Sequence, residues 1–310
     1  MKRKVTWLSA LLLAASLLLS GCTPLVADVP QSQTVCTTFY PIYALTSAIA
    51  DGAEHLEVQC MTQPQDGCLR SYEMSDWDLY MMMYSADVVL SAGNGLESFS
   101  EKLETLGGTA LPVAEVMYGL DHYHMQAAGD EESHFTGVNP HLYMSLDGAI
   151  EIAESIAGTM MLFDEINTDV YDKNLNRVHE KLDQMRESIT KKTAVCAGIS
   201  AAVLNEALFY PATDCGLEIV GHYERESSEM LYGDSLESCL EALNEMGAQV
   251  VLIEKQAPSA LVDAIENAGF AVVRLETMST LSEKDGAEGY FDALESNADA
   301  IAAACGLIRG

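Results

Sequence analysis

Short apolar runs alternate along the chain with longer stretches in which apolar residues recur every three or four positions. The first pattern is typical of buried β-strands and the second of amphipathic helices. The predicted strands form two sets, at residues 34–38, 56–61, 87–91 and 110–114, and at 194–199, 217–221, 249–254 and 271–275. Predicted helices lie between them, at 43–50 and 75–85, and at 205–213, 235–246 and 258–268. Strands separated by helices favour parallel sheets in an α/β fold, and two such sets indicate two lobes.

A nearly continuous helical pattern separates the two sets, at residues 148–161 and 165–191. Its second segment carries an amphipathic stripe, made of Ile166, Val170, Leu175, Val178, Leu182, Met185 and Ile189. At 1.5 Å per residue, this segment would be about 40 Å long. We therefore predict two (β/α) lobes with parallel sheets, joined by a long spine helix.

The first residues are typical of a secretion signal. Lys2, Arg3 and Lys4 precede an apolar run at residues 8–19, and Ser20-Gly21-Cys22 follows it. That run is too short to cross a hydrocarbon core of about 30 Å. The LSGC ending resembles the lipobox of bacterial lipoproteins, which implies a signal peptide at 1–21, a lipidated Cys22 and a flexible tether over 22–33. The protein would then be anchored by lipid to the outer face of the cell membrane. The alternative is an ordinary cleaved signal with an incidental cysteine.

The charge balance narrows the class of partner. The whole chain has 16 basic and 47 acidic residues, and removal of residues 1–21 would leave 13 basic residues and a net charge of −34. Such a charge opposes nucleic-acid binding, which requires phosphates to be neutralised by lysine and arginine. It suits an extracellular protein that meets cations, although acidic surfaces also serve solubility.

The remaining cysteines are expected to be buried thiols or, in one case, a disulfide pair. Cys36, Cys196 and Cys239 lie in apolar or helical patterns that are typical of buried thiols. Cys60 and Cys68 flank one loop, where they either form a disulfide in an oxidising compartment or remain thiols. The sequence has no Cys-x-x-Cys pair, which argues against a structural zinc knuckle.

Several short motifs are informative as an ordered set: TTFYPIY (37–43), SYEMS (71–75), ADVV (86–89), GNGLE (93–97), NPHLY (139–143), CGLE (215–218) and VLIE (251–254). In this order and spacing they resemble the zinc and manganese branch of the ABC-transporter substrate-binding proteins, over nearly the whole mature chain. The resemblance implies an N-terminal lobe at 34–162, a linking helix at 163–192 and a C-terminal lobe at 193–310, with a ligand cleft between the lobes. It also implies Zn²⁺ or Mn²⁺ as the transported ligand, and an ABC permease and its ATPase as partners. We expect a monomer.

The resemblance identifies the positions that hold the ion in the family. Arg70 stands where the family has its first histidine, and a protonated guanidinium cannot ligate a cation. His141, in the NPH motif, matches the second ligand. Asn205 stands at the third position and offers only a neutral oxygen, while neighbouring Glu206 would point about 100° away on a helix. Glu276 follows the last strand of the second lobe, where the family has aspartate.

Arg70 changes the electrostatics of this site. Two unit charges about 4 Å apart at an effective dielectric near 20 interact by about 4 kcal/mol, so an ion beside Arg70 would be strongly disfavoured. The simplest hypothesis is that Arg70 pairs with Glu276 and replaces the ion. Otherwise His141 and Glu276 would be the ordinary metal ligands, and Asn205 a weak one.

A segment rich in histidine and acidic residues precedes His141 and resembles a loop of zinc-specific relatives. Its histidines are His122, His124 and His134. They would gather Zn²⁺ with the nearby carboxylates, or the segment is simply a solvated acidic loop. Cys68, two residues before Arg70, is a further candidate ligand as a thiolate.

The leading interpretation is an extracytoplasmic substrate-binding lipoprotein of a metal-ion ABC importer. The alternative is a divergent relative that has lost metal binding in the cleft and serves as an adhesion, binding or accessory lipoprotein. An enzyme is not expected, because the sequence has no Gly-x-Ser-x-Gly elbow, phosphate-binding glycine loop or His-Glu-x-x-His motif.

Overall fold

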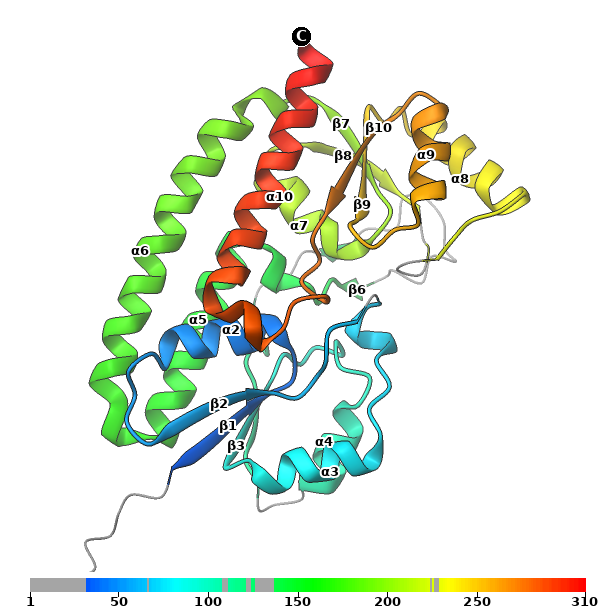
Figure 1. The fold of residues 1–310 in the computed structure, drawn as a ribbon. Helices are drawn as coiled ribbons and strands as arrows, with labels where there is room; N and C mark the ends of the chain where they lie inside the picture. Colours follow the sequence, from blue (N-terminus) through cyan, green and yellow to red (C-terminus); the bar gives the residue numbers. More distant parts are fainter. Residues whose placement is uncertain are drawn as a thin grey trace, which may run out of the picture. The chain divides into compact units, whose positions relative to one another are not determined.

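The computed structural model describes residues 32–65, 67–107, 111–120, 124–125, 137–223, 225 and 229–310 (Figure 1). The predicted signal peptide, Cys22 and nearly all of the predicted tether lie outside these residues. Residues 33–310 form one compact unit by their internal contacts. Among the described residues, no helix combines the length and the apolar character needed to cross a membrane.

The first sheet is parallel, with the strand order β2-β1-β3-β4. Its strands are β1 (Gln33–Thr37), β2 (Leu56–Cys60), β3 (Val88–Ser91) and β4 (Val113–Glu115). Helices α2 (Tyr40–Ile49), α3 (Asp76–Ser85) and α4 (Ser100–Gly107) accompany it. Every residue of β3 is buried, which explains its continuous apolar sequence, since a central parallel strand has both faces covered.

The second sheet is also parallel, with the order β10-β9-β7-β8. Its strands are β7 (Ser200–Val203), β8 (Glu218–His222), β9 (Val250–Glu254) and β10 (Ala271–Leu275). Helices α7 (Phe209–Asp214), α8 (Asp234–Glu245) and α9 (Ser259–Asn267) belong to this lobe. The predicted fold class, two α/β lobes with parallel sheets, is confirmed.

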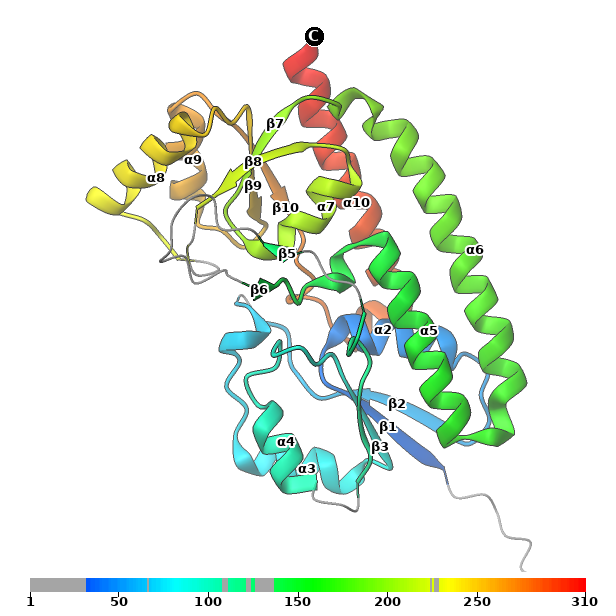
Figure 2. The same ribbon diagram turned by 180° about the vertical axis from the view of Figure 1, so that it is seen from behind.

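Long helices run alongside both sheets (Figures 1 and 2). They are α5 (Leu146–Phe163), α6 (Thr168–Thr193) and α10 (Gly286–Arg309). Helix α6 is the predicted spine, and it packs against α5 and α10. Its buried stripe includes Val178, Leu182 and Ile189 as expected, but it begins at Tyr171, since Ile166 precedes the helix and is 82% exposed.

Helix α10 was not predicted, although the sequence carries a signal for it. Its buried residues recur every three or four positions: Tyr290, Leu294, Ala298, Ile301 and Cys305. The helix packs against α2 of the first lobe as well as against α6 and β10. It therefore contributes to both halves of the molecule, and not only to the lobe in which its sequence lies.

The predicted strand at 194–199 was wrong. Ala194–Cys196 forms the 3-10 helix η4, which continues from α6, and the strand begins only at Ser200. Arg309 of α10 donates hydrogen bonds to the carbonyls of Val195 and Ala197, which holds the turn in place. Gly198 then takes a φ of 76°, a left-handed conformation that glycine adopts readily, and turns the chain into β7.

The remaining described elements are short. They are the 3-10 helices η1 (Leu69–Ser71), η2 (Leu142–Met144), η3 (Glu165–Asn167), η5 (Glu206–Leu208) and η6 (Glu283–Asp285), and the antiparallel pair β5 (His124–Met125) and β6 (Gly137–Val138). Of these, η1, η2 and η5 carry the residues of the site described below.

Asp214 links the second lobe to the long helices. Its Oδ2 accepts a hydrogen bond of 2.9 Å from the backbone N–H of Leu146, the first residue of α5. Burial raises the pKa of this carboxyl from 3.8 to about 6, against the opposing effect of the hydrogen bond. Because the folded-state pKa lies above the unfolded value, the folded state binds the proton more tightly. Proton binding by Asp214 therefore stabilises the folded state. This stabilisation is complete below about pH 4 and is lost as the pH rises through about 6.

We predict that Asp214→Asn raises the thermal midpoint at pH 7 and flattens the dependence of stability on pH between about 4 and 6. The expected gain at pH 7 is about 3 kcal/mol, since the pKa rises from 3.8 to about 6 and each pKa unit corresponds to about 1.4 kcal/mol. Thermal unfolding across this pH range measures it, and Asp183→Asn, at an exposed position of α6, is the matched control. Parallel stability curves for the wild type and Asp214→Asn would contradict the prediction.

Candidate functional site

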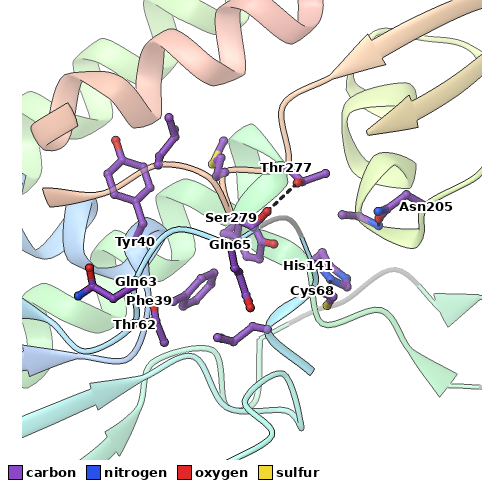
Figure 3. Close-up of a pocket in the computed structure, with 16 residues that line it drawn as sticks. Phe39, Tyr40, Thr62, Gln63, Gln65, Cys68, His141, Asn205, Thr277 and Ser279 are labelled. Carbon is purple, nitrogen blue, oxygen red and sulfur yellow. Dashed lines mark hydrogen bonds between the residues drawn. The ribbon is translucent and has the colours of Figure 1, made fainter. Parts of the chain in front are cut away.

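A pocket of about 490 Å³, including its open mouth, is lined by residues from both lobes (Figure 3). The first lobe contributes residues between Phe39 and Leu69, and the second contributes Asn205, Ala207 and the segment from Thr277 to Leu281. His141 and Tyr143 line it from the chain around η2. Most of the polar groups on its wall are neutral oxygens and amides: Thr62, Gln63, Gln65, Asn205, Thr277 and Ser279.

His141 is a buried titratable group of this pocket, held in place by hydrogen bonds. It is 2% exposed. The amide of neighbouring Asn139 donates from Nδ2 to the carbonyl of Glu206 at 2.8 Å, which orients the amide. Its Oδ1 therefore faces His141, where it accepts from the backbone N–H at 3.0 Å and lies 2.9 Å from Nδ1. An acceptor at Nδ1 assigns the ring proton to that nitrogen and leaves a lone pair on Nε2.

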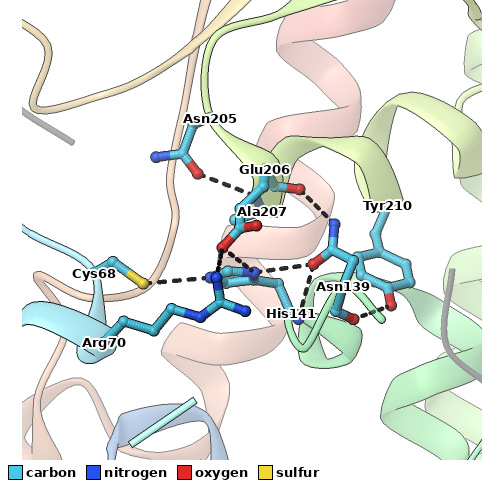
Figure 4. A network of polar contacts seen from close by, with 8 residues as sticks. All are labelled: Cys68, Arg70, Asn139, His141, Asn205, Glu206, Ala207 and Tyr210. Atoms are coloured by element: carbon cyan, nitrogen blue, oxygen red, sulfur yellow. Dashed lines mark hydrogen bonds and ion pairs between the residues drawn. The ribbon is translucent and has the colours of Figure 1, made fainter. Parts of the chain in front are cut away.

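The lone pair of His141 Nε2 faces a thiol. Cys68 Sγ lies 3.5 Å from Nε2 (Figure 4). Burial, and secondarily the positive charge of Arg70, lower the pKa of His141 to about 3. The imidazole is therefore neutral at physiological pH. A neutral imidazole with a free Nε2 lone pair can accept a hydrogen bond from a thiol or bind a cation.

Arg70 pairs with Glu206, not with Glu276 as the sequence suggested. The distance from the Arg70 guanidinium to Glu206 Oε1 is 3.1 Å, and the same oxygen lies 3.6 Å from His141 Nδ1. Arg70 belongs to η1 of the first lobe and Glu206 to η5 of the second, so the ion pair crosses between the lobes. The Arg70 side chain is 43% exposed and that of Glu206 is 12% exposed.

Glu206, and not Asn205, faces His141 because the predicted helix at 205–213 begins one residue late. Asn205 is the N-cap of η5 with an extended backbone, and its side chain accepts from the N–H of Ala207 at 3.0 Å. An N-cap residue lies outside the helical spiral, so the 100° rotation assumed for consecutive helical residues does not apply here. Asn205 still lines the pocket, as expected from the sequence.

Glu276 has a structural role in this arrangement. Its Oε1 accepts from the N–H of Met278 at 2.9 Å and from the hydroxyl of Thr280 at 3.1 Å, and its Oε2 lies 3.5 Å from Lys255 Nζ. Met278 has a φ of 66°, a left-handed conformation that costs a non-glycine residue about 1 kcal/mol or more. Glu276 thus stabilises the turn that brings Thr277 and Ser279 to the pocket, and its carboxylate is already engaged.

His122 and His134 lie outside the described residues, and only the backbone of His124 is described, in β5. Cys60 and Cys68 are not bridged, and the Cys60 thiol contacts Thr62 instead. Within the part of the chain that the structure describes, no three histidine, cysteine, aspartate or glutamate side chains are arranged to hold one metal ion.

Known proteins resemble this chain along most of its length. Residues 35–304 match the family ZnuA, described as the periplasmic component A of the zinc-uptake complex. The zinc-binding protein AdcA of Streptococcus pyogenes serotype M3 is 22% identical over 288 residues, which cover 86% of this chain and 55% of AdcA. The high-affinity zinc uptake system protein ZnuA of Yersinia pestis is 25% identical over 288 residues, covering 86% of this chain and 87% of the relative.

A solved structure confirms the fold. The SBP FpvC of Pseudomonas aeruginosa, in complex with Mn²⁺, superposes with a TM-score of 0.77 at 20% identity and covers 89% of this chain and 99% of FpvC. The chain spans about half the length of the streptococcal relative. The match over residues 35–304 is nevertheless continuous through both lobes and the spine helix. The chain belongs to the ZnuA family of zinc-uptake components, as its ordered motifs predicted.

Proposed function

We propose that this chain is the substrate-binding component of a metal-ion ABC importer, which captures a divalent transition-metal ion between its lobes and delivers it to a membrane permease and its ATPase. Membership of the ZnuA family supports the class of function. The observation that carries the proposal is the environment of His141. Its imidazole is buried and neutral, it lines the pocket, and the lone pair of its Nε2 is not used by a ring proton. Such a ring is ready to bind a cation without first losing a proton.

The ion is cargo, and the chemistry of the pocket favours Zn²⁺ with Mn²⁺ as the second candidate. Imidazole nitrogen suits Zn²⁺ and other borderline ions, whereas carboxylate and water oxygens suit Mn²⁺. The first relatives named above are zinc proteins. The His141 ring is also supported by a hydrogen bond from its second nitrogen, an arrangement that orients metal-binding histidines.

Arg70 is the main electrostatic obstacle to an ion in this pocket. Its guanidinium is compensated by Glu206, whose Oε1 also lies 3.6 Å from His141 Nδ1. An arriving cation would compete with Arg70 for that carboxylate. Because the Arg70 side chain is 43% exposed, its guanidinium can turn further into solvent and be hydrated there, and solvent screening reduces its repulsion of the ion.

Arg70 also supports a second candidate function, one that does not involve metal binding in the pocket. Arg70 stands where the family has a histidine ligand, and its pairing with Glu206 joins the two lobes without an ion. A relative that no longer binds metal here would serve as a binding, adhesion or accessory lipoprotein. The experiments below separate the two functions.

We also propose that the chain is a lipoprotein anchored through Cys22 to the outer face of the membrane and that it acts as a monomer without enzymatic activity. The LSGC sequence before the first lobe supports the anchor. Lipid attachment at this position would keep the pocket close to the permease.

His141→Ala is expected to weaken Zn²⁺ binding at least a hundredfold, about 2.8 kcal/mol, because it removes the only imidazole on the described wall of the pocket. The measurement is titration calorimetry of the full chain in mild detergent, stripped of metal with a chelator, with Zn²⁺ and with Mn²⁺. His179→Ala, which removes a histidine of α6 that contacts Glu154, is the control. Metal binding that survives His141→Ala, or no binding by the wild type, would argue against the proposed cleft receptor.

Arg70→Gln is expected to tighten Zn²⁺ binding about tenfold or more. The substitution removes a positive charge from the pocket and releases Glu206. Arg186→Gln provides a matched control, because Arg186 pairs with Asp147 on the long helices, at 2.6 Å and with a similar exposure of 37%. If Arg70→Gln binds no better than the wild type, the guanidinium is not the obstacle.

Cys22→Ala is expected to abolish incorporation of a labelled fatty acid and to release the protein from the membrane fraction. Cys60→Ala should leave both properties unchanged, since that thiol is buried within the first lobe. Labelling and fractionation in a bacterial host measure both. Retention of the label by Cys22→Ala would exclude Cys22 as the site of lipidation.

A further inference from the structure

We infer that Cys68 is a metal ligand, so that the pocket holds Zn²⁺ through a thiolate–imidazole pair formed with His141, and that this pair selects Zn²⁺ over Mn²⁺. The inference rests on the proposed function and names the donor set and the ion class of that site. It assigns the sulfur donor to a position two residues before Arg70 in the first lobe.

The separation of the two donors fits one tetrahedral zinc ion. Zinc binds thiolate sulfur at about 2.3 Å and imidazole nitrogen at about 2.0–2.1 Å, and a tetrahedral angle between those bonds places the sulfur and nitrogen about 3.5 Å apart. Cys68 Sγ and His141 Nε2 are 3.5 Å apart. The separation of the two donors therefore already matches one shared zinc ion, which would lie to one side of the line that joins them.

The imidazole is oriented for this role before any ion arrives. Asn139 holds Nδ1, and it is itself oriented by the Glu206 carbonyl, so a ring flip would lose the Nδ1 hydrogen bond. The lone pair of Nε2 therefore stays directed at Cys68. Both donors line the pocket, which gives an ion a route from solvent (Figure 3).

The other coordination positions remain open to oxygen donors. Among the described residues no third histidine, cysteine or acidic side chain completes a metal cluster, so water or wall oxygens such as those of Gln65 and Asn205 would fill them. Glu206, once separated from Arg70, is a carboxylate within reach among the described residues, 3.6 Å from His141 Nδ1. A site with few fixed protein donors suits an ion that must be released, because closed four-ligand sites are typical of structural zinc.

Sulfur decides which ion is favoured. Thiolate is a soft ligand that suits Zn²⁺, whereas Mn²⁺ prefers oxygen and ranks below Zn²⁺ in affinity for mixed nitrogen and sulfur sites. On binding, the Cys68 thiol loses its proton to solvent and a sulfur–zinc bond forms, with no oxidation or reduction. Without an ion, the same 3.5 Å contact is a hydrogen bond from the thiol to the imidazole.

Cobalt provides the direct test, because a thiolate bound to Co²⁺ gives an intense charge-transfer absorption in the near ultraviolet. The full chain, stripped of metal, is titrated with Co²⁺ and then with Zn²⁺ and Mn²⁺. We expect the absorption in the wild type and in Cys60→Ser, and its loss in Cys68→Ser. We also expect Cys68→Ser to bind Zn²⁺ at least tenfold more weakly, about 1.4 kcal/mol, with little change for Mn²⁺.

Alkylation of the wild-type chain gives a second readout that does not depend on a variant folding. Zn²⁺ should protect Cys68 from iodoacetamide, as measured by peptide mass spectrometry. If Zn²⁺ binds in a manner that depends on His141 but gives no thiolate absorption and no protection, the Cys68 inference is overturned and the proposed function stands. If neither Zn²⁺ nor Co²⁺ binds to the wild type, both are overturned.

Discussion

The side-chain amide of Asn139 connects the two lobes and at the same time orients the histidine of the pocket. One end of the amide donates to the Glu206 carbonyl in the second lobe, and the other end accepts from His141 (Figure 4). Tyr210 adds a hydrogen bond of 2.7 Å to the Asn139 backbone carbonyl. The tautomer of His141, the direction of its lone pair and the contact with Cys68 all follow from this one oriented amide, because an imidazole has only one donor when it is neutral.

The ion pair between Arg70 and Glu206 lies across the same junction and has the opposite effect on a cation. It places a positive charge beside the donor histidine and occupies the Glu206 carboxylate. The pair is only partly buried, and the net contribution of such a pair to stability is small, about 0–1 kcal/mol. An ion that engaged Glu206 would therefore displace a weak interaction, and the competition between the guanidinium and the metal would tune the affinity of the pocket.

The pocket wall on the side of the second lobe depends on the long C-terminal helix. Asn297 of α10 bonds both the backbone N–H and the carbonyl of Glu276, at 2.8 and 2.9 Å. Glu276 in turn holds the left-handed turn at Met278. The turn reaches across to the first lobe, where the N–H of Gln65 donates to the Ser279 carbonyl at 2.9 Å. A helix that packs on both halves thus fixes a loop that lines the site between them.

The sequence by itself determined the alternation of strands and helices, the spine helix, the family and the place of His141, because these depend on local apolar periods and on short motifs.

The sequence did not determine which acidic side chain faces His141. The family's spacing indicated Asn205 as the ligand and helix geometry turned Glu206 away from it, but Asn205 caps η5 and Glu206 lies against the histidine. It also suggested that Glu276 would meet Arg70, whereas the Met278 turn and Lys255 engage that carboxylate. Only the tertiary structure decides such pairings, because residues far apart in the chain compete for the same few partners and the distances between them are set by packing.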